Sequence, residues 1–223
     1  MFKIEEAEPD AGAIHQELLE KTGILIIKLS PFIDIRYLLR KFDSISQIHV
    51  VAIDQDCREI LVVLDRENDS SDPPVIAWSN EKNRIREFMS TFSRNEKTCQ
   101  FGYTESLLFD PDVAVRKTGL FNSLGIQFNL KKLAPNSHLY TGETFIENFP
   151  GRIFIIEKSM TFREFLREKS LNQANIAIRN FHIKPDEIRK RSGIMEGGDV
   201  YIFCTTNLEN ERVVLITRKA DTR

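Results

Sequence analysis

The 223-residue sequence predicts an α+β protein whose first segment has the order of an α/β fold. Apolar runs of strand length, such as Ile24–Ile27 and Ile60–Leu64, alternate with stretches that favour helices. Tight turns join some of these strands, which is typical of antiparallel pairs. No run approaches the roughly 20 apolar residues that a membrane-spanning helix needs, so we expect no membrane partner.

The first segment is expected to begin with a helix that opens at residues 8–10, because proline is tolerated in the first helical turn. Gly23 ends this helix. The run Ile24–Ile27 then predicts a strand that is buried on both faces of a parallel sheet. A second helix is expected over residues 35–42.

Residues 48–53 and 59–64 predict two further strands. The turn of residues 54–58 between them is too short for a helical crossover, so the two strands are expected to pair antiparallel. This order of elements is that of the last part of a doubly wound sheet. No strand in the segment leads into a glycine-rich turn, whose backbone amides hold nucleotide-type cofactors. We therefore expect no cofactor to bind this chain.

The clearest linker covers residues 68–74, which are polar and end in a proline pair. It predicts a domain boundary after residue 70, and Phe149–Gly151 predicts a second one. Between these boundaries we expect a strand at 75–78, a charged helix at 80–92, a helix at 113–125 and an extended piece at 128–133. After the second boundary we expect strands at 152–156 and 175–181, helices at 161–166 and 186–192, and a hairpin of residues 200–204 and 212–216.

The three cysteines, Cys57, Cys99 and Cys204, are odd in number and scattered, and no two of them form a CxxC pair. This pattern argues against a disulfide framework and against a structural zinc site. We therefore expect no metal and a location in the reducing cytoplasm.

The charges are distributed unevenly, although the net charge of the chain is only −2. Residues 1–72 contain 8 basic and 15 acidic side chains, a net of −7. Residues 151–191 contain 10 basic and 5 acidic side chains, a net of +5. Such an asymmetry indicates a polyanionic partner or, alternatively, solvated charged faces.

The strongest polar cluster lies near the end of the chain and comprises Arg179, Asn180, Lys184, Arg189, Lys190 and Arg191. Cations of this kind neutralise phosphates, and arginine also stacks on bases. Three of these residues are consecutive on a predicted helix, so they cannot all point the same way. The cluster therefore predicts either a contact with RNA or a solvated helix end, where cations complement the helix dipole.

Asn136, His138 and Tyr140 lie in one short polar stretch that also contains Ser137 and Thr141. Hydrogen-bonding groups beside an aromatic ring are suited to an unpaired RNA base. The alternative is a structural turn whose side chains bind the neighbouring backbone. His138 has no cysteine or carboxylate at ligand spacing, which argues against a metal there.

Four stretches, taken in order, carry a resemblance to one family: residues 8–10 with 28–31 and 34–35, residues 135–141, residues 149–152, and residues 175–181 with 196–201. They resemble the C-terminal half of bacterial, Bacteroidetes-type class I S-adenosylmethionine-dependent methyltransferases. The resemblance covers nearly the whole chain. It implies the last part of a Rossmann-like methyltransferase sheet at 1–70, a ferredoxin-like domain at 73–149 and a THUMP-like domain at 150–223.

The resemblance also implies a function. The parent protein is expected to transfer a methyl group from S-adenosylmethionine to an RNA, either tRNA or rRNA, and this region is expected to bind and position that RNA. The cofactor-binding half is expected to lie before Met1, so this chain alone is predicted to be inactive. Lys28, Ser30 and Asp34 follow a strand end, where α/β sheets bind ligands, and are expected on the substrate side. The alternative there is a plain strand exit.

A protein-interaction or assembly module without an RNA ligand is the main alternative. A small-molecule enzyme lacks support, because no triad, carboxylate pair or metal cluster is visible in the sequence. Because the predicted sheet is incomplete, the strand at Ile24–Ile27 is expected to expose an edge, which favours a homodimer.

Overall fold

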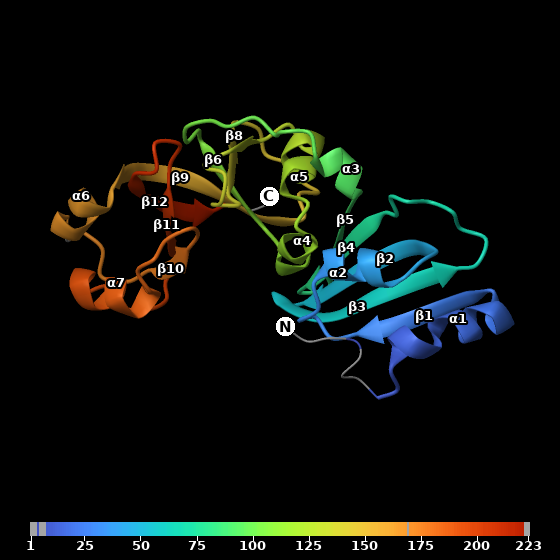
Figure 1. Cartoon of the computed structure of the whole chain (residues 1–223). Helices are drawn as coiled ribbons and strands as arrows, with labels where there is room; N and C mark the ends of the chain where they lie inside the picture. Colours follow the sequence, from blue (N-terminus) through green and yellow to red (C-terminus); the bar gives the residue numbers. More distant parts are fainter. Residues whose placement is uncertain (1–3, 5–7, 169, 221–223) are drawn as a thin grey trace. The chain divides into compact units, whose positions relative to one another are not determined.

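The computed structural model describes residues 4, 8–168 and 170–220. The chain divides into two compact units, and most of their helices and strands are labelled in Figure 1. The first unit contains residues 1–97 and 112–123, and the second contains residues 98–111 and 124–223. The chain thus leaves the first unit after Lys97 and returns to it for one short segment.

The first unit is built on a five-stranded sheet with the order β1-β3-β2-β4-β5. Its strands are β1 (Ile24–Leu29), β2 (Ile45–Ile53), β3 (Asp56–Asp65), β4 (Val75–Glu81) and β5 (Arg84–Ser90). Strands β2 and β4 are parallel, and all other neighbours are antiparallel. The antiparallel pairing of β2 with β3, predicted from their short turn, is confirmed.

The helices of this unit are α1 (Ala11–Thr22), α2 (Ile35–Lys41), α3 (Phe92–Asn95) and α4 (Val113–Thr118). Asp10 and Asp34 accept hydrogen bonds from backbone N–H groups in the first turns of α1 and α2, as N-cap residues do. Gly23 ends α1 with φ +77°, a conformation that glycine adopts at little cost. Both helices therefore lie where the sequence predicts them.

Strand β1 corrects one prediction. It lies at the edge of the sheet and pairs only with β3, in the antiparallel direction. Ile24 and Ile26 are 58% and 63% exposed, so the strand is not buried on both faces. A short apolar run is compatible with either environment, because its composition does not report which elements cover it.

The segment after the expected linker corrects two more. Strand β4 pairs with β2 and continues the same sheet, so residues 68–74 form a loop within one unit and not a domain boundary. Residues 84–90, expected in a helix, form β5 against β4. Loops within a domain and linkers between domains share the same polar, proline-containing composition. Only the pairing of β4 with β2 shows that residues 68–74 belong to the first kind.

The second unit contains a seven-stranded sheet with the order β10-β11-β12-β9-β6-β8-β7. Only β10 and β11 are parallel neighbours. Its strands are β6 (Leu107–Pro111), β7 (Lys131–Lys132), β8 (Tyr140–Gly142), β9 (Gly151–Thr161), β10 (Asn175–Ile178), β11 (Val200–Thr206) and β12 (Arg212–Lys219). The predicted hairpin of the last two strands is confirmed.

The helices that follow α4 are α5 (Phe121–Gln127), α6 (Phe162–Arg167) and α7 (Pro185–Ser192). The single helix expected over 113–125 is instead two helices, because Gly119 adopts a left-handed conformation that ends α4. Thr161 caps α6 and Gly193 ends α7, both as the sequence predicts. Among the described residues, none of the helices has the length and apolar character required to span a bilayer.

Strands β6 and β9 lie side by side in the middle of the second sheet, and a close backbone approach marks where they meet. A Cβ atom at Gly151 would stand 2.4 Å from the carbonyl oxygen of Asp110 and 2.8 Å from the Cα of Pro111. Only glycine fits at such a distance. The two predicted domains that meet at residue 150 therefore share one sheet.

Candidate nucleic-acid interface

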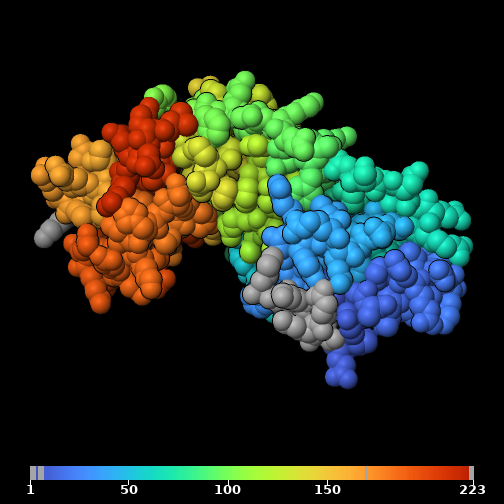
Figure 2. All heavy atoms as spheres, in the orientation of Figure 1, coloured from blue at the N-terminus to red at the C-terminus, as the bar shows by residue number. Residues whose placement is uncertain are grey.

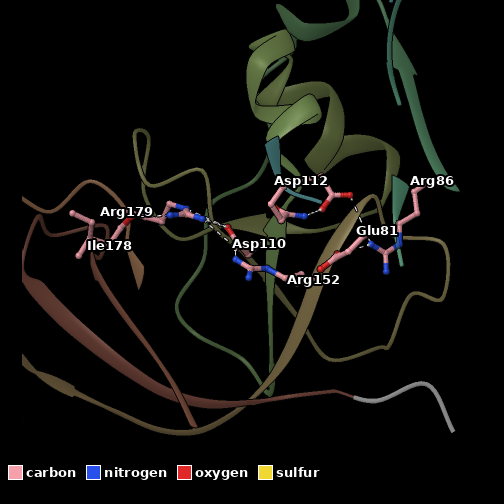
Figure 3. Close-up of polar contacts among 8 residues, drawn as sticks. Glu81, Arg86, Asp110, Asp112, Arg152, Ile178 and Arg179 are labelled. Atoms are coloured by element: carbon pink, nitrogen blue, oxygen red, sulfur yellow. Dashed lines mark hydrogen bonds and ion pairs between the residues drawn. The ribbon is translucent and has the colours of Figure 1, made fainter. Parts of the chain in front are cut away.

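The buried carboxylate of Asp110 on β6 is the centre of the strongest ionic cluster in the second unit. Its side chain is fully buried. Arg179 donates to it from Nε and Nη2, over distances of 2.8 to 3.1 Å. Arg152, the cross-strand neighbour on β9, donates from Nη2 at 2.6 Å. Figure 3 shows Asp110 between the two guanidinium groups.

This cluster changes the interpretation of Arg179. The sequence predicts that Arg179 contacts RNA, but its planar donor group is occupied by Asp110, and its side chain is only 20% exposed. Arg152 was not singled out from the sequence, and neither was Asp110. The signal is not local, since the three residues are far apart in the chain and only the fold brings them together.

The rest of the predicted cluster divides into paired and unpaired side chains. Asn180 donates to the hydroxyl of Thr206 at 2.6 Å. Arg189 donates to the carbonyl of Ala174 at 3.1 Å and lies 3.6 Å from the carboxylate of Glu196, and Arg191 pairs with Glu187 within α7.

Lys184 and Lys190 are different. Both are exposed, and within the described ranges neither forms an ion pair. Lys184 precedes the first turn of α7, and Lys190 lies in its last turn. Of the residues expected to contact RNA in this cluster, these two present a charge to solvent that no neighbouring carboxylate of the described chain neutralises.

The polar stretch around residue 138 forms a turn that binds its own backbone. Ser137 is buried, accepts from the N–H groups of Ala134 and Leu139, and donates to the carbonyl of Ala134. The ring of Tyr140 is fully buried, and burial raises the pKa of its hydroxyl well above the ordinary value. Of the two alternatives for this stretch, the structure therefore agrees with the structural turn, and Tyr140 is not accessible to a base. Asn136 is exposed and His138 is half-buried.

Lys28, Ser30 and Asp34 lie close together in sequence, at the carboxyl end of β1 and the start of α2. Lys28 lies 3.3 Å from a carboxylate oxygen of Glu59. Ser30 accepts from the N–H of Phe32 at 3.4 Å, and Asp34 accepts from that of Tyr37 at 2.9 Å. Ser30 and Asp34 thus stabilise the local backbone, which agrees with the alternative that these residues form a plain strand exit.

The first unit holds a second buried carboxylate, that of Asp112 just before α4. It accepts from the hydroxyl of Ser79 at 2.5 Å and from the amide of Gln55 at 2.6 Å. Arg86 of β5 lies 3.7 Å away and is also 3.7 Å from Glu81. These bonds fix the start of α4 on the sheet.

The thiols are poor nucleophiles. Burial raises the pKa of Cys204 to about 12 and also raises those of Cys57 and Cys99, which keeps all three in the unreactive protonated form at neutral pH. In the described part of the chain, His, Cys, Asp and Glu form no group of three that is arranged to hold a metal.

Two family models match consecutive parts of the chain that together contain every strand of the second sheet. Residues 107–150 match the family model of a ferredoxin-like domain, and residues 151–219 match that described as THUMP domain-like. Both domain types expected from the sequence are therefore confirmed. The ferredoxin-like match begins at the start of β6.

The chain is also similar to a crystal structure described as that of a "putative methyltransferase from Porphyromonas gingivalis W83". The TM-score is 0.90 at 32% sequence identity, and the match covers 98% of this chain and 56% of that chain. This chain thus spans little more than half the length of that relative. None of the curated proteins matches it.

We predict that Arg179→Met lowers the free energy of unfolding by about 3 kcal/mol, because the buried carboxylate of Asp110 loses the guanidinium group of Arg179. Urea unfolding followed by circular dichroism measures this. The matched control is Arg218→Met, since Arg218 pairs with Glu157 on the surface and is expected to contribute less than about 1 kcal/mol. Equal, small losses for both variants would contradict the structural role of Arg179.

Proposed function

We propose that this chain is the substrate-recognition region of a methyltransferase that acts on RNA. One observation carries the proposal: residues 151–219 match a THUMP-like domain in a chain that is similar, over 98% of its length, to the methyltransferase candidate of Porphyromonas gingivalis. The resemblance of the sequence to class I S-adenosylmethionine-dependent methyltransferases with a THUMP-like domain supports it. The substrate is then a tRNA or an rRNA.

The distribution of charge supports a local RNA contact. Residues 1–72 carry a net charge of −7 and repel a polyanion, whereas residues 151–191 carry +5. Lys184 and Lys190 present their ammonium groups to solvent. In this proposal the role of the chain is to bind and orient RNA.

A protein-interaction module remains the competing function, and a salt titration separates the two. We predict that the chain binds structured RNA with an affinity that falls linearly with salt on a log–log plot, because bound phosphates release counterions. Changing Lys184 and Lys190 together to Glu is expected to weaken binding by about 2 kcal/mol, the usual worth of one or two charge-assisted contacts. Fluorescence anisotropy with labelled tRNA and an rRNA hairpin measures both effects.

The matched control changes Lys82 and Lys97 to Glu, since both are exposed lysines of the first unit. This variant is expected to bind RNA nearly as well as the unmodified chain. Equal losses in the two double variants, or binding that ignores salt, would favour the interaction module.

S-adenosylmethionine is the methyl donor that the resemblance implies for the parent enzyme. The described residues do not fit it, because β1 leads into Ser30 and Pro31 and β2 leads into the turn at Asp54 and Gln55. Neither exit is the glycine-rich turn whose amides would hold the donor.

We therefore predict that isothermal titration of this chain with S-adenosylmethionine gives no saturable heat at micromolar concentrations. The physical reason is the missing set of converging backbone N–H groups. A dissociation constant in the micromolar range would contradict this prediction. It would also contradict the interpretation of residues 1–70 as only the last part of a methyltransferase sheet.

We also propose that the chain forms a homodimer through the edge of β1. No strand of the described residues pairs with this edge, which lies beside the exposed Ile24 and Ile26, and such edges readily pair with another strand. Changing both isoleucines to Lys is expected to turn a dimer into a monomer in sedimentation velocity. A monomer at high concentration for the unmodified chain would contradict the proposal.

A further inference from the structure

A groove of about 820 Å³ lies on the second unit, and its lining includes neither Lys184 nor Lys190. Arginines from three elements surround it. The residues that line it are Thr161, Phe162, Arg163, Leu166, Arg167, Arg191, Glu211 and Arg212. In Figure 2, α6 and α7, in shades of orange, and the red hairpin before β12 border one another on the visible face.

The fold explains why these arginines converge. Val213 of β12 pairs with Thr161 at the end of β9, so Arg212 lies beside the start of α6. Helix α6 then packs against β12 and α7, which brings Arg163 and Arg167 toward Arg191. The arrangement joins three segments that lie 20 or more residues apart and is not visible as a motif in the sequence.

The groove has more cations than acids, and its acids are engaged elsewhere. Glu211 accepts at 3.0 Å from Asn207 within its own turn. Glu164 accepts from the backbone and hydroxyl of Thr161 at 2.8 Å in a capping box. Both carboxylates keep their negative charge, but the lining as a whole is positive because it contains four arginines and one glutamate, Glu211.

The arginines themselves differ in how they are paired. Arg191 is paired with Glu187, and Arg167 lies near Glu164, whose pKa is lowered by hydrogen bonds from Thr161 and further by Arg167 and Lys158.

Arg163 and Arg212 are exposed, and neither forms an ion pair with another residue in the ranges 4, 8–168 and 170–220. The groove therefore offers two guanidinium groups without a carboxylate partner in the described chain, and two more at its rim.

The lining also has an apolar part. Leu166 is half-buried and lies next to Phe162, which is almost fully buried. Grooves for single-stranded nucleic acid combine cations that follow the backbone with apolar or aromatic surface for the bases and sugars. The volume also falls within the range of about 300–1,000 Å³ that is usual for pockets of small ligands.

We propose that this groove binds a single-stranded stretch of the RNA, with its phosphates on Arg163 and Arg212. This inference rests on the proposed function and adds a site and a strand state to it. A duplex keeps its bases stacked inside and cannot bring them to Leu166, whereas a single strand exposes both bases and phosphates.

The test uses the full chain and three probes of equal length and label: a ten-nucleotide single-stranded RNA, the matching RNA duplex and a poly-glutamate peptide. The variant Arg163→Gln with Arg212→Gln removes the two unpaired guanidinium groups. The control is Arg58→Gln with Arg94→Gln, two exposed arginines of the first unit. Circular dichroism verifies that both variants fold.

The expected result is a loss of at least tenfold in affinity for the single strand, with a salt slope that falls by about 1.4, since each phosphate contact on a single strand contributes about 0.7. The control variant is expected to bind as the unmodified chain does. Binding of the duplex is expected to change less than twofold.

Each other outcome overturns the inference in a distinct way. If the groove variant binds the single strand normally while the Lys184 and Lys190 variant does not, the groove is not the site but the proposed function stands. If the unmodified chain binds no RNA probe, the proposed function itself fails. If poly-glutamate binds as tightly as RNA and depends on the same arginines, the groove receives an acidic protein segment instead.

Discussion

The buried carboxylate of Asp110 organises the second unit. A charge removed from water is costly unless cations and hydrogen bonds compensate for it, and here Arg152 and Arg179 supply both. Asp110 lies on β6, Arg152 lies on β9, and Arg179 directly follows β10. One anion therefore joins strands that are not all neighbours in the sheet. It also joins the ferredoxin-like residues 107–150 to the THUMP-like residues 151–219.

Pairing with a buried carboxylate decides which cations of the second unit are available to bind a ligand. An arginine whose guanidinium group donates to a buried carboxylate contributes to stability and has few N–H donors left for a phosphate. An arginine without a partner keeps all of its donors. Counting charges along the chain cannot separate the two kinds, so the most basic segment of the sequence and the most available cations need not coincide. Arg179 and Arg163 illustrate the difference.

What the sequence predicts well is local. The ends of α1, α6 and α7 follow from Asp10, Thr161 and Gly193, because a cap acts on the backbone within one turn. What it predicts poorly depends on distant partners. The pairing of β4 with β2 decides whether residues 68–74 separate domains, and the burial of Tyr140 depends on which elements cover it. The groove of arginines likewise arises only when three distant segments meet.

Asp110 holds the ferredoxin-like residues of the second unit, 107–111 and 124–150, together with the THUMP-like residues 151–219. Hydrogen exchange with mass spectrometry tests it directly, by following peptides of 107–150 and 151–219 in the unmodified chain and in Asp110→Asn. The account predicts that the substitution, which removes the anion and leaves both arginines without it, speeds exchange in both segments together. Faster exchange in one segment with unchanged protection in the other would contradict it.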